Sequence, residues 1–150
     1  MSVDYTVASL PALAFGQPAP ISWEKFAEAC GGSVPESAAW RDLETQLRNA
    51  LAEARGGAKW RRPADGCSLF WRGRVLACFQ EKDVAKRDEM IDRVWWDAAG
   101  ELTNPASPLG GGALETYAVR LRIAIRRSLM SKDAGNAAFD RLTAATKEMI

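Results

Sequence analysis

Residues 114–129 read LETYAVRLRIAIRRSL and carry the clearest amphipathic pattern in this 150-residue chain. Apolar residues recur there every three or four positions, which is the spacing of one face of an α-helix. That face consists of Leu114, Tyr117, Ala118, Leu121, Ile125 and Leu129. The arginines beside it do not share one tight face, and we interpret them as its solvated surround: Arg120, Arg122, Arg126 and Arg127. The stretch therefore predicts a helix that buries one face against other helices.

The preceding sequence predicts a helix over 34–55. Ser33 and Glu36 fit a capping box, in which the serine caps the helix and the glutamate three residues later reaches back. Gly56 and Gly57 then stop the helix. Its apolar face would consist of Trp40, Leu43, Leu47, Ala50, Leu51 and Ala54.

Further helices are predicted on both sides of these two. Ser22 is suited to cap a short helix that ends at Gly31 and Gly32. Apolar residues at helical spacing predict another helix over 82–102. After residue 129 the pattern breaks at Ser131–Asp133, where Asp133 is a candidate cap for a last helix carrying Phe139, Leu142, Ala145, Thr146 and Met149.

Two segments are less regular. Residues 67–79 could form a helix or a strand, and we favour a helix because the neighbouring segments are helical. Near the N-terminus Val3, Tyr5 and Val7 alternate with polar residues, which favours a short extended segment. Linkers are predicted near 56–66 and 103–112, and we interpret the glycines at 110–112 as a flexible hinge. The predicted fold is mainly α, a single domain over 1–150 built as a bundle of four to six helices.

Composition excludes several kinds of chemistry. The net charge of +1 lacks the basic excess of most nucleic-acid binders. The chain has no histidine, so a Ser-His or Cys-His nucleophile is excluded. Its three cysteines have no CxxC spacing, so we predict reduced thiols and no metal site or cofactor. We find neither a signal peptide nor an apolar run long enough to span a bilayer, and we expect a soluble, cytoplasmic protein that is not embedded in a membrane.

Aromatic and charged clusters leave alternatives open. Adjacent residues on a helix point about 100° apart, so Trp95 and Trp96 either both fill the core or place one ring on a partner surface. Acidic residues on the same predicted helix could form ion pairs with Arg120, Arg122 or Arg126, or could serve a small metal-dependent enzyme, and we favour the ion pairs: Asp88, Asp92, Asp97 and Glu101.

Several blocks resemble a bacterial family of unknown function whose genes typically lie beside those of V/A-type ATPases. The blocks follow the family's order and cover most of the chain: Tyr5–Pro11, Leu47–Ala52, Met90–Asp97, Leu114–Ile123, Asp133–Gly135 and Phe139. The chain is shorter than expected for the family, residues 56–80 match nothing in it, and Arg120 stands where the family has lysine. The resemblance implies a mostly helical protein associated with the ATPase, distantly like its C or d stalk subunit, and it implies no catalytic residue.

We therefore predict a non-catalytic accessory, stalk-like or assembly component of a V/A-type ATPase, involved in ion transport through that complex. It would lie at the membrane only through the complex, would bind other protein subunits, and would take no small-molecule substrate. The candidate partner-binding residues are Trp60, Trp71, Trp96, Tyr117 and Arg120. The alternative is a helical nucleic-acid-binding domain that uses Trp and Arg pairs, with Trp60, Arg61, Arg62, Arg72 and Arg74 as its contacts.

Overall fold

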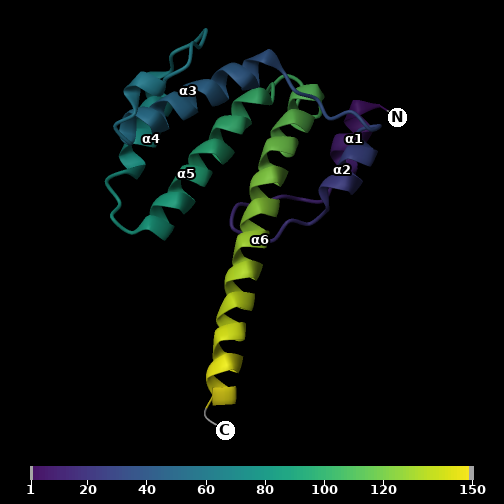
Figure 1. The fold of residues 1–150 in the computed structure, drawn as a ribbon. Coiled ribbons are helices and arrows are strands. Elements are labelled where there is room, and N and C mark those ends of the chain that lie inside the picture. Colours follow the sequence, from purple (N-terminus) through teal and green to yellow (C-terminus); the bar gives the residue numbers. More distant parts are fainter. Residues whose placement is uncertain (1, 149–150) are drawn as a thin grey trace.

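A computed structural model describes the backbone of residues 2–148 and the side chains within 2–57 and 59–130. The fold is mainly helical, as predicted, and the described residues contain six α-helices and no strand (Figure 1). The helices are α1 (Val3–Ser9), α2 (Trp23–Ala29), α3 (Ala38–Ala54), α4 (Leu69–Cys78), α5 (Val84–Ala99) and α6 (Gly111–Glu148). Short 3₁₀ turns, η1 (Ala58–Trp60) and η2 (Gly100–Leu102), follow α3 and α5.

Short polar side chains begin five of the helices. Each cap has extended backbone and accepts a hydrogen bond from an N–H of the first turn, which would otherwise lack a partner. The predicted cap at Ser22 is confirmed, and so is the helical form of 67–79, which Ser68 caps. The caps are Ser2, Ser22, Ser37, Ser68 and Asp83. Positive φ angles at Gly31, Gly32 and Gly56 confirm the predicted glycine ends of α2 and α3.

The extended segment predicted near the N-terminus is wrong. Residues 3–9 form α1, because Ser2 accepts a hydrogen bond from the N–H of Tyr5 and Asp4 lies in the first turn, where the helix dipole favours an anion. The helix stops at Leu10, whose backbone is extended because Pro11 follows it. The alternation of apolar and polar residues over only five positions did not outweigh these capping signals.

The predicted capping box at Ser33 and Glu36 is also wrong. The helix begins at Ala38, and Ser37 caps it by accepting from the N–H of Trp40 at 3.1 Å. Ser37 is held in turn by Glu115 of α6, which accepts from the Ser37 N–H at 2.8 Å and from its hydroxyl at 2.6 Å. The start of α3 is therefore fixed by a contact 78 residues away in the sequence.

The break predicted at Ser131–Asp133 does not occur. α6 runs without interruption for 38 residues, from Gly111 to Glu148. Serine, lysine and aspartate weaken a helix only slightly, and no proline stands in this stretch. The side chains predicted to form the last helical face, from Phe139 to Met149, lie outside the described side chains.

Two apolar clusters form the core, and α6 contributes to both. The larger joins α3, α4 and α5 to one side of α6 through residues such as Leu47, Val75 and Val94. The smaller joins α1, α2 and the loop between them to α6 around Phe26 and Leu121. Figure 1 shows α6 between these two groups of helices, with its C-terminal half continuing beyond them. Among the described residues, none of the helices is both long and apolar enough to cross a membrane.

The segment that follows η1 is tied to α3. Asp42 accepts hydrogen bonds from the N–H groups of Asp65 at 2.5 Å and Gly66 at 3.0 Å, and Gln46 accepts from the N–H of Ser68 at 2.7 Å. The hydrogen bond from Asp65, then those from Gln46 and Gly66, hold the pKa of Asp42 below its usual value. The ionised carboxylate thus anchors a segment predicted only as a loop.

This anchor predicts a loss of stability in acid. A carboxyl group whose pKa is lowered by folding stabilises the protein fully above its unfolded pKa, near 4, and loses that contribution as the pH falls through its lower folded pKa. We therefore expect the urea midpoint of the wild type to fall between pH 5 and pH 2, and Asp42→Asn to reduce that dependence while lowering the midpoint at pH 6. Equal pH dependence in the two proteins would contradict the anchor.

Candidate functional site

A buried carboxylate joins α5 to α6. The side chain of Asp92 is 7% exposed and forms ion pairs with Arg126 and with Arg127, the latter at 2.9 Å. Asp97 is 28% exposed and also forms two ion pairs, with Arg74 of α4 at 2.8 Å and with Arg93 of α5 at 3.1 Å. The interpretation of these acidic residues as ion-pair partners is therefore confirmed at Asp92, with Arg126 as a predicted partner. Within the described residues, no group of three or more acidic or cysteine side chains is placed to hold a metal ion.

Arg120 and Trp96 form a unit that faces the interior. Trp96 is 6% exposed, and its ring meets Phe15 edge-on at 5.5 Å between centroids. The Arg120 guanidinium lies 5.3 Å from the centre of the Trp96 ring, and its Nε donates to the Trp96 carbonyl at 3.0 Å. Burial lowers the pKa of Arg120, and the nearby Asp97 carboxylate partly opposes that effect. Both residues therefore support the packing of α5 on α6.

The five residues predicted to bind a partner do not gather on one surface. Trp96 and Trp71 lie in the core at 6% and 5% exposure, so neither offers a ring to a partner. Trp71 also donates its indole N–H to Glu101 at 2.7 Å. Tyr117 is half-buried and donates its hydroxyl to the Pro11 carbonyl at 2.7 Å. Of the five, Trp60 alone is largely exposed, at 72%.

The alternative nucleic-acid contacts are partly occupied within the fold. Arg72 pairs with Glu53, and Arg74 pairs with Asp97. The Asn49 side-chain amide donates to the Arg62 carbonyl at 2.7 Å and accepts from the Arg62 N–H at 2.8 Å. Two of the five candidate contacts thus have their guanidinium groups paired with acidic side chains of this chain.

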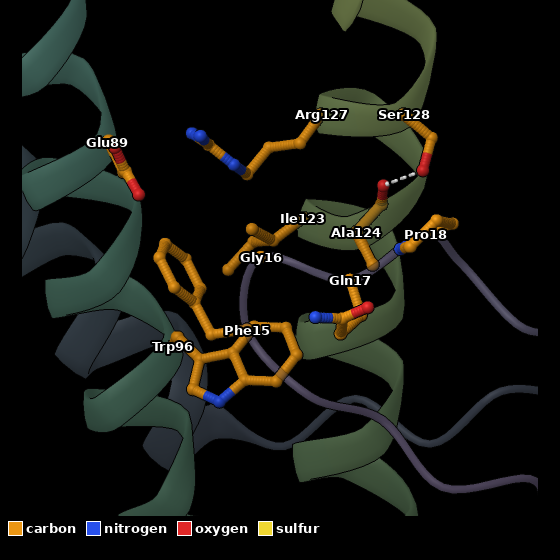
Figure 2. Close-up of a pocket in the computed structure, with 10 residues that line it drawn as sticks. All are labelled: Phe15, Gly16, Gln17, Pro18, Glu89, Trp96, Ile123, Ala124, Arg127 and Ser128. Carbon is orange, nitrogen blue, oxygen red and sulfur yellow. Dashed lines mark hydrogen bonds between the residues drawn. The ribbon is translucent and has the colours of Figure 1, made fainter.

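A pocket of about 470 Å³ opens between α5, α6 and the loop after α1 (Figure 2). Phe15 and Trp96 close one end, and Figure 2 shows Arg127 extending from α6 toward the α5 side, where Glu89 lies. Two of its polar groups have partners: Arg127 pairs with Asp92, while the Ser128 hydroxyl donates to the Ala124 carbonyl and accepts from the Ala19 N–H. The Glu89 carboxylate and the Gln17 amide also line the pocket, and neither side chain forms a hydrogen bond or ion pair within the described residues. The hydrogen bond from Ala19 to Ser128 fastens the N-terminal loop to α6 beside this pocket.

A wider groove of about 640 Å³ lies on another face, and we call it the α3–α6 groove. One wall is α3 with Arg48 and Arg55, and the other is α6 with Arg122 and Arg126. The floor is apolar and comes mostly from α5, with Trp95 half-buried at its centre. The groove also contains Glu44, Asp88 and Asp92, so it combines an apolar floor with charged walls.

An apolar patch marks the place where α6 leaves the bundle. Leu129 and Met130 are 55% and 48% exposed, and with Trp23 and Ile125 they line a hollow of about 460 Å³. Arg122 borders it, with its guanidinium 4.4 Å from the centre of the Trp23 ring. We call these four apolar residues the α6 patch.

The α6 patch was not predicted from the sequence, and Trp96, which was predicted to bind a partner, is buried. Leu129 closes the amphipathic stripe of 114–129, and its exposure could not be read from that periodicity. Trp95 and Trp96 are adjacent residues of the same type, and their tertiary contacts distinguish them: Phe15 and Arg120 pack on the Trp96 ring. No family model, curated protein or solved structure matches the chain, so the site rests on these contacts.

Proposed function

We propose that this chain is a non-catalytic docking component of a larger assembly, with α6 as its docking arm. The observation that carries the proposal is the course of α6: its first half packs in both core clusters, and its second half continues beyond the other helices (Figure 1). With 38 residues, α6 is about 57 Å long. Most helices in proteins gain their stability from packing, so a partner along the projecting half would stabilise it.

The α6 patch supports the same proposal. Leu129 and Met130 are exposed apolar side chains at the base of the arm, next to the partly buried ring of Trp23. Contiguous exposed apolar surface is typical of places where another polypeptide binds. A partner that packs along the arm would cover this patch.

The partner that we propose is a subunit of a bacterial V/A-type ATPase. This part of the proposal is supported by the resemblance to the family encoded beside such ATPases. All six of the resembling blocks fall in or across α1, α3, α5 and α6, and they include core residues such as Leu47, Val94 and Leu121. In this role the chain would act as an accessory, stalk-like or assembly component.

The test is recovery of ATPase subunits with the tagged full chain from its native cell after mild lysis. We expect Leu129→Glu to reduce that recovery at least about tenfold, because a charge would replace an apolar contact. Because Leu129 is exposed, we expect the substitution to change the free energy of unfolding of the protein by no more than about 0.5 kcal/mol. Urea denaturation checks that expectation.

The matched control is Leu69→Glu at a leucine on α4 that is also exposed, at 74%, and lies outside the patch. It should leave recovery unchanged. Repeated absence of every ATPase subunit from the wild-type sample would refute the ATPase assignment, and equal losses in the two variants would refute the role of the patch.

A further inference from the structure

We infer that the α3–α6 groove binds an acidic amphipathic helix of a partner protein. This inference rests on the proposed docking function and specifies the chemistry of one partner segment. α3 and α6 form the two walls, and α5 lies between them as the floor. A groove between two helices over a third can receive another helix along its length, as helix-binding grooves generally do.

The floor favours apolar side chains. Ile91 and Ile123 line it and are 9% and 7% exposed, and the more accessible Leu51 and Trp95 line it with them. A half-buried tryptophan in an apolar setting is a typical anchor at protein interfaces. One or two apolar residues of a partner helix would cover the Trp95 ring.

The walls favour a partner with negative charge. Asp92 is already compensated by two arginines, and Glu44 is paired with Arg48 at 3.3 Å. Arg55 and Arg122 also line the groove, and neither forms an ion pair with any side chain in the described part of the chain. Asp88 is then the one lining carboxylate that lacks an ion pair within the same residues. The groove therefore keeps an excess of positive charge on both walls.

The mixture of charges distinguishes between possible occupants. A nucleic-acid strand carries a phosphate at every position, and the unpaired carboxylate of Asp88 would repel it in the groove. A second copy of this chain placed face to face would set the basic walls of the two copies opposite one another. A peptide helix can place carboxylates toward Arg55 and Arg122 and a neutral or basic residue toward Asp88, so it satisfies the whole set.

The first test uses a synthetic probe and the full chain. The probe is a fluorescent helical peptide of about 18 residues, roughly five turns, with leucines along one face and glutamates on either side. A second peptide has lysine in place of every glutamate. We expect the acidic peptide to bind with an affinity that falls as salt rises, and we expect the basic peptide not to bind.

A charge exchange in the protein makes this test specific. We expect the double variant R55E/R122E to lose about tenfold or more of its affinity for the acidic peptide and to gain affinity for the basic one. The control K82E/K86E makes the same change in net charge at exposed lysines outside the groove and should bind like the wild type. The inference would be overturned if the acidic peptide bound neither the wild type nor K82E/K86E. It would also be overturned if R55E/R122E and K82E/K86E lost affinity equally.

A cross-linking experiment identifies the natural occupant. A photoreactive p-benzoylphenylalanine replaces Ala52, which lines the groove on α3, and the cross-linked peptide is sequenced after irradiation in the native cell. An acidic amphipathic segment of another protein supports the inference, whether or not that protein is an ATPase subunit. Cross-links to a second copy, or strong binding of a dT oligonucleotide that R55E/R122E abolishes, would overturn it. The groove and the ATPase assignment can therefore fail separately.

Discussion

Gly112→Ala is expected to destabilise the protein by about 2–3 kcal/mol, because a methyl group at this position would overlap the backbone carbonyl of Leu102. The 3₁₀ turn that ends at Leu102 packs against the first turn of α6, so the obstacle is main chain and cannot rotate away as a side chain could. For a domain of this size such a loss lowers the melting temperature by roughly 6–12 °C.

Gly111 provides the matched control. A methyl group added there meets nothing within 4 Å, and the residue is likewise helical. Alanine replaces the flexible glycine backbone with a better helix former, so we expect Gly111→Ala to be neutral or to stabilise by up to about 0.5–1 kcal/mol. Thermal melts of both variants decide the matter. Equal effects at the two positions would mean that the glycines act as the flexible hinge that the sequence predicts.

These glycines illustrate what the sequence can and cannot specify. The prolines and glycines predict a linker over 103–112, but α6 already begins at Gly111, so Gly111 and Gly112 are helical and the hinge predicted over 110–112 is wrong at these two positions. The close approach of Gly112 to Leu102 depends on how η2 folds back, and that geometry leaves no local signature. The same holds for α3, where Ser33 and Ser37 are both good caps and Glu115 selects Ser37 from a distant helix.

The helices themselves were largely predictable because their signals are local. Serine caps, glycine ends and apolar repeats lie within one or two turns of the residues they organise. The sequence predicted ion pairs between the acidic residues of α5 and Arg120, Arg122 or Arg126, and of these three arginines Arg126 forms one in the described residues, with Asp92. The second partner of Asp92, Arg127, was not predicted. The α3–α6 groove combines residues from three helices separated by long stretches of sequence, so no pattern in one segment could indicate it.

The tandem tryptophans test the assignment of core and surface directly. Trp96→Ala is expected to cost about 3–5 kcal/mol, because it removes a large buried ring that packs on Phe15 and supports the guanidinium of Arg120. Trp95 is half-buried on the floor of the α3–α6 groove, so Trp95→Ala should cost only about 1 kcal/mol. Urea denaturation measures both, with slopes compared to confirm that the same transition is observed.

For binding of the acidic peptide we expect the opposite ranking: a change at Trp95 should matter more than a change at Trp96. Trp95→Ala removes the ring that we expect a partner helix to cover, and it should weaken the acidic peptide about tenfold or more while the protein stays folded. Trp96 does not line the groove, so Trp96→Phe, which keeps a buried aromatic ring, should bind the peptide like the wild type even though its stability falls. If Trp95→Ala proves the more destabilising change, or if Trp96→Phe loses peptide binding first, then Trp96 would be the contact residue that the sequence alone suggested.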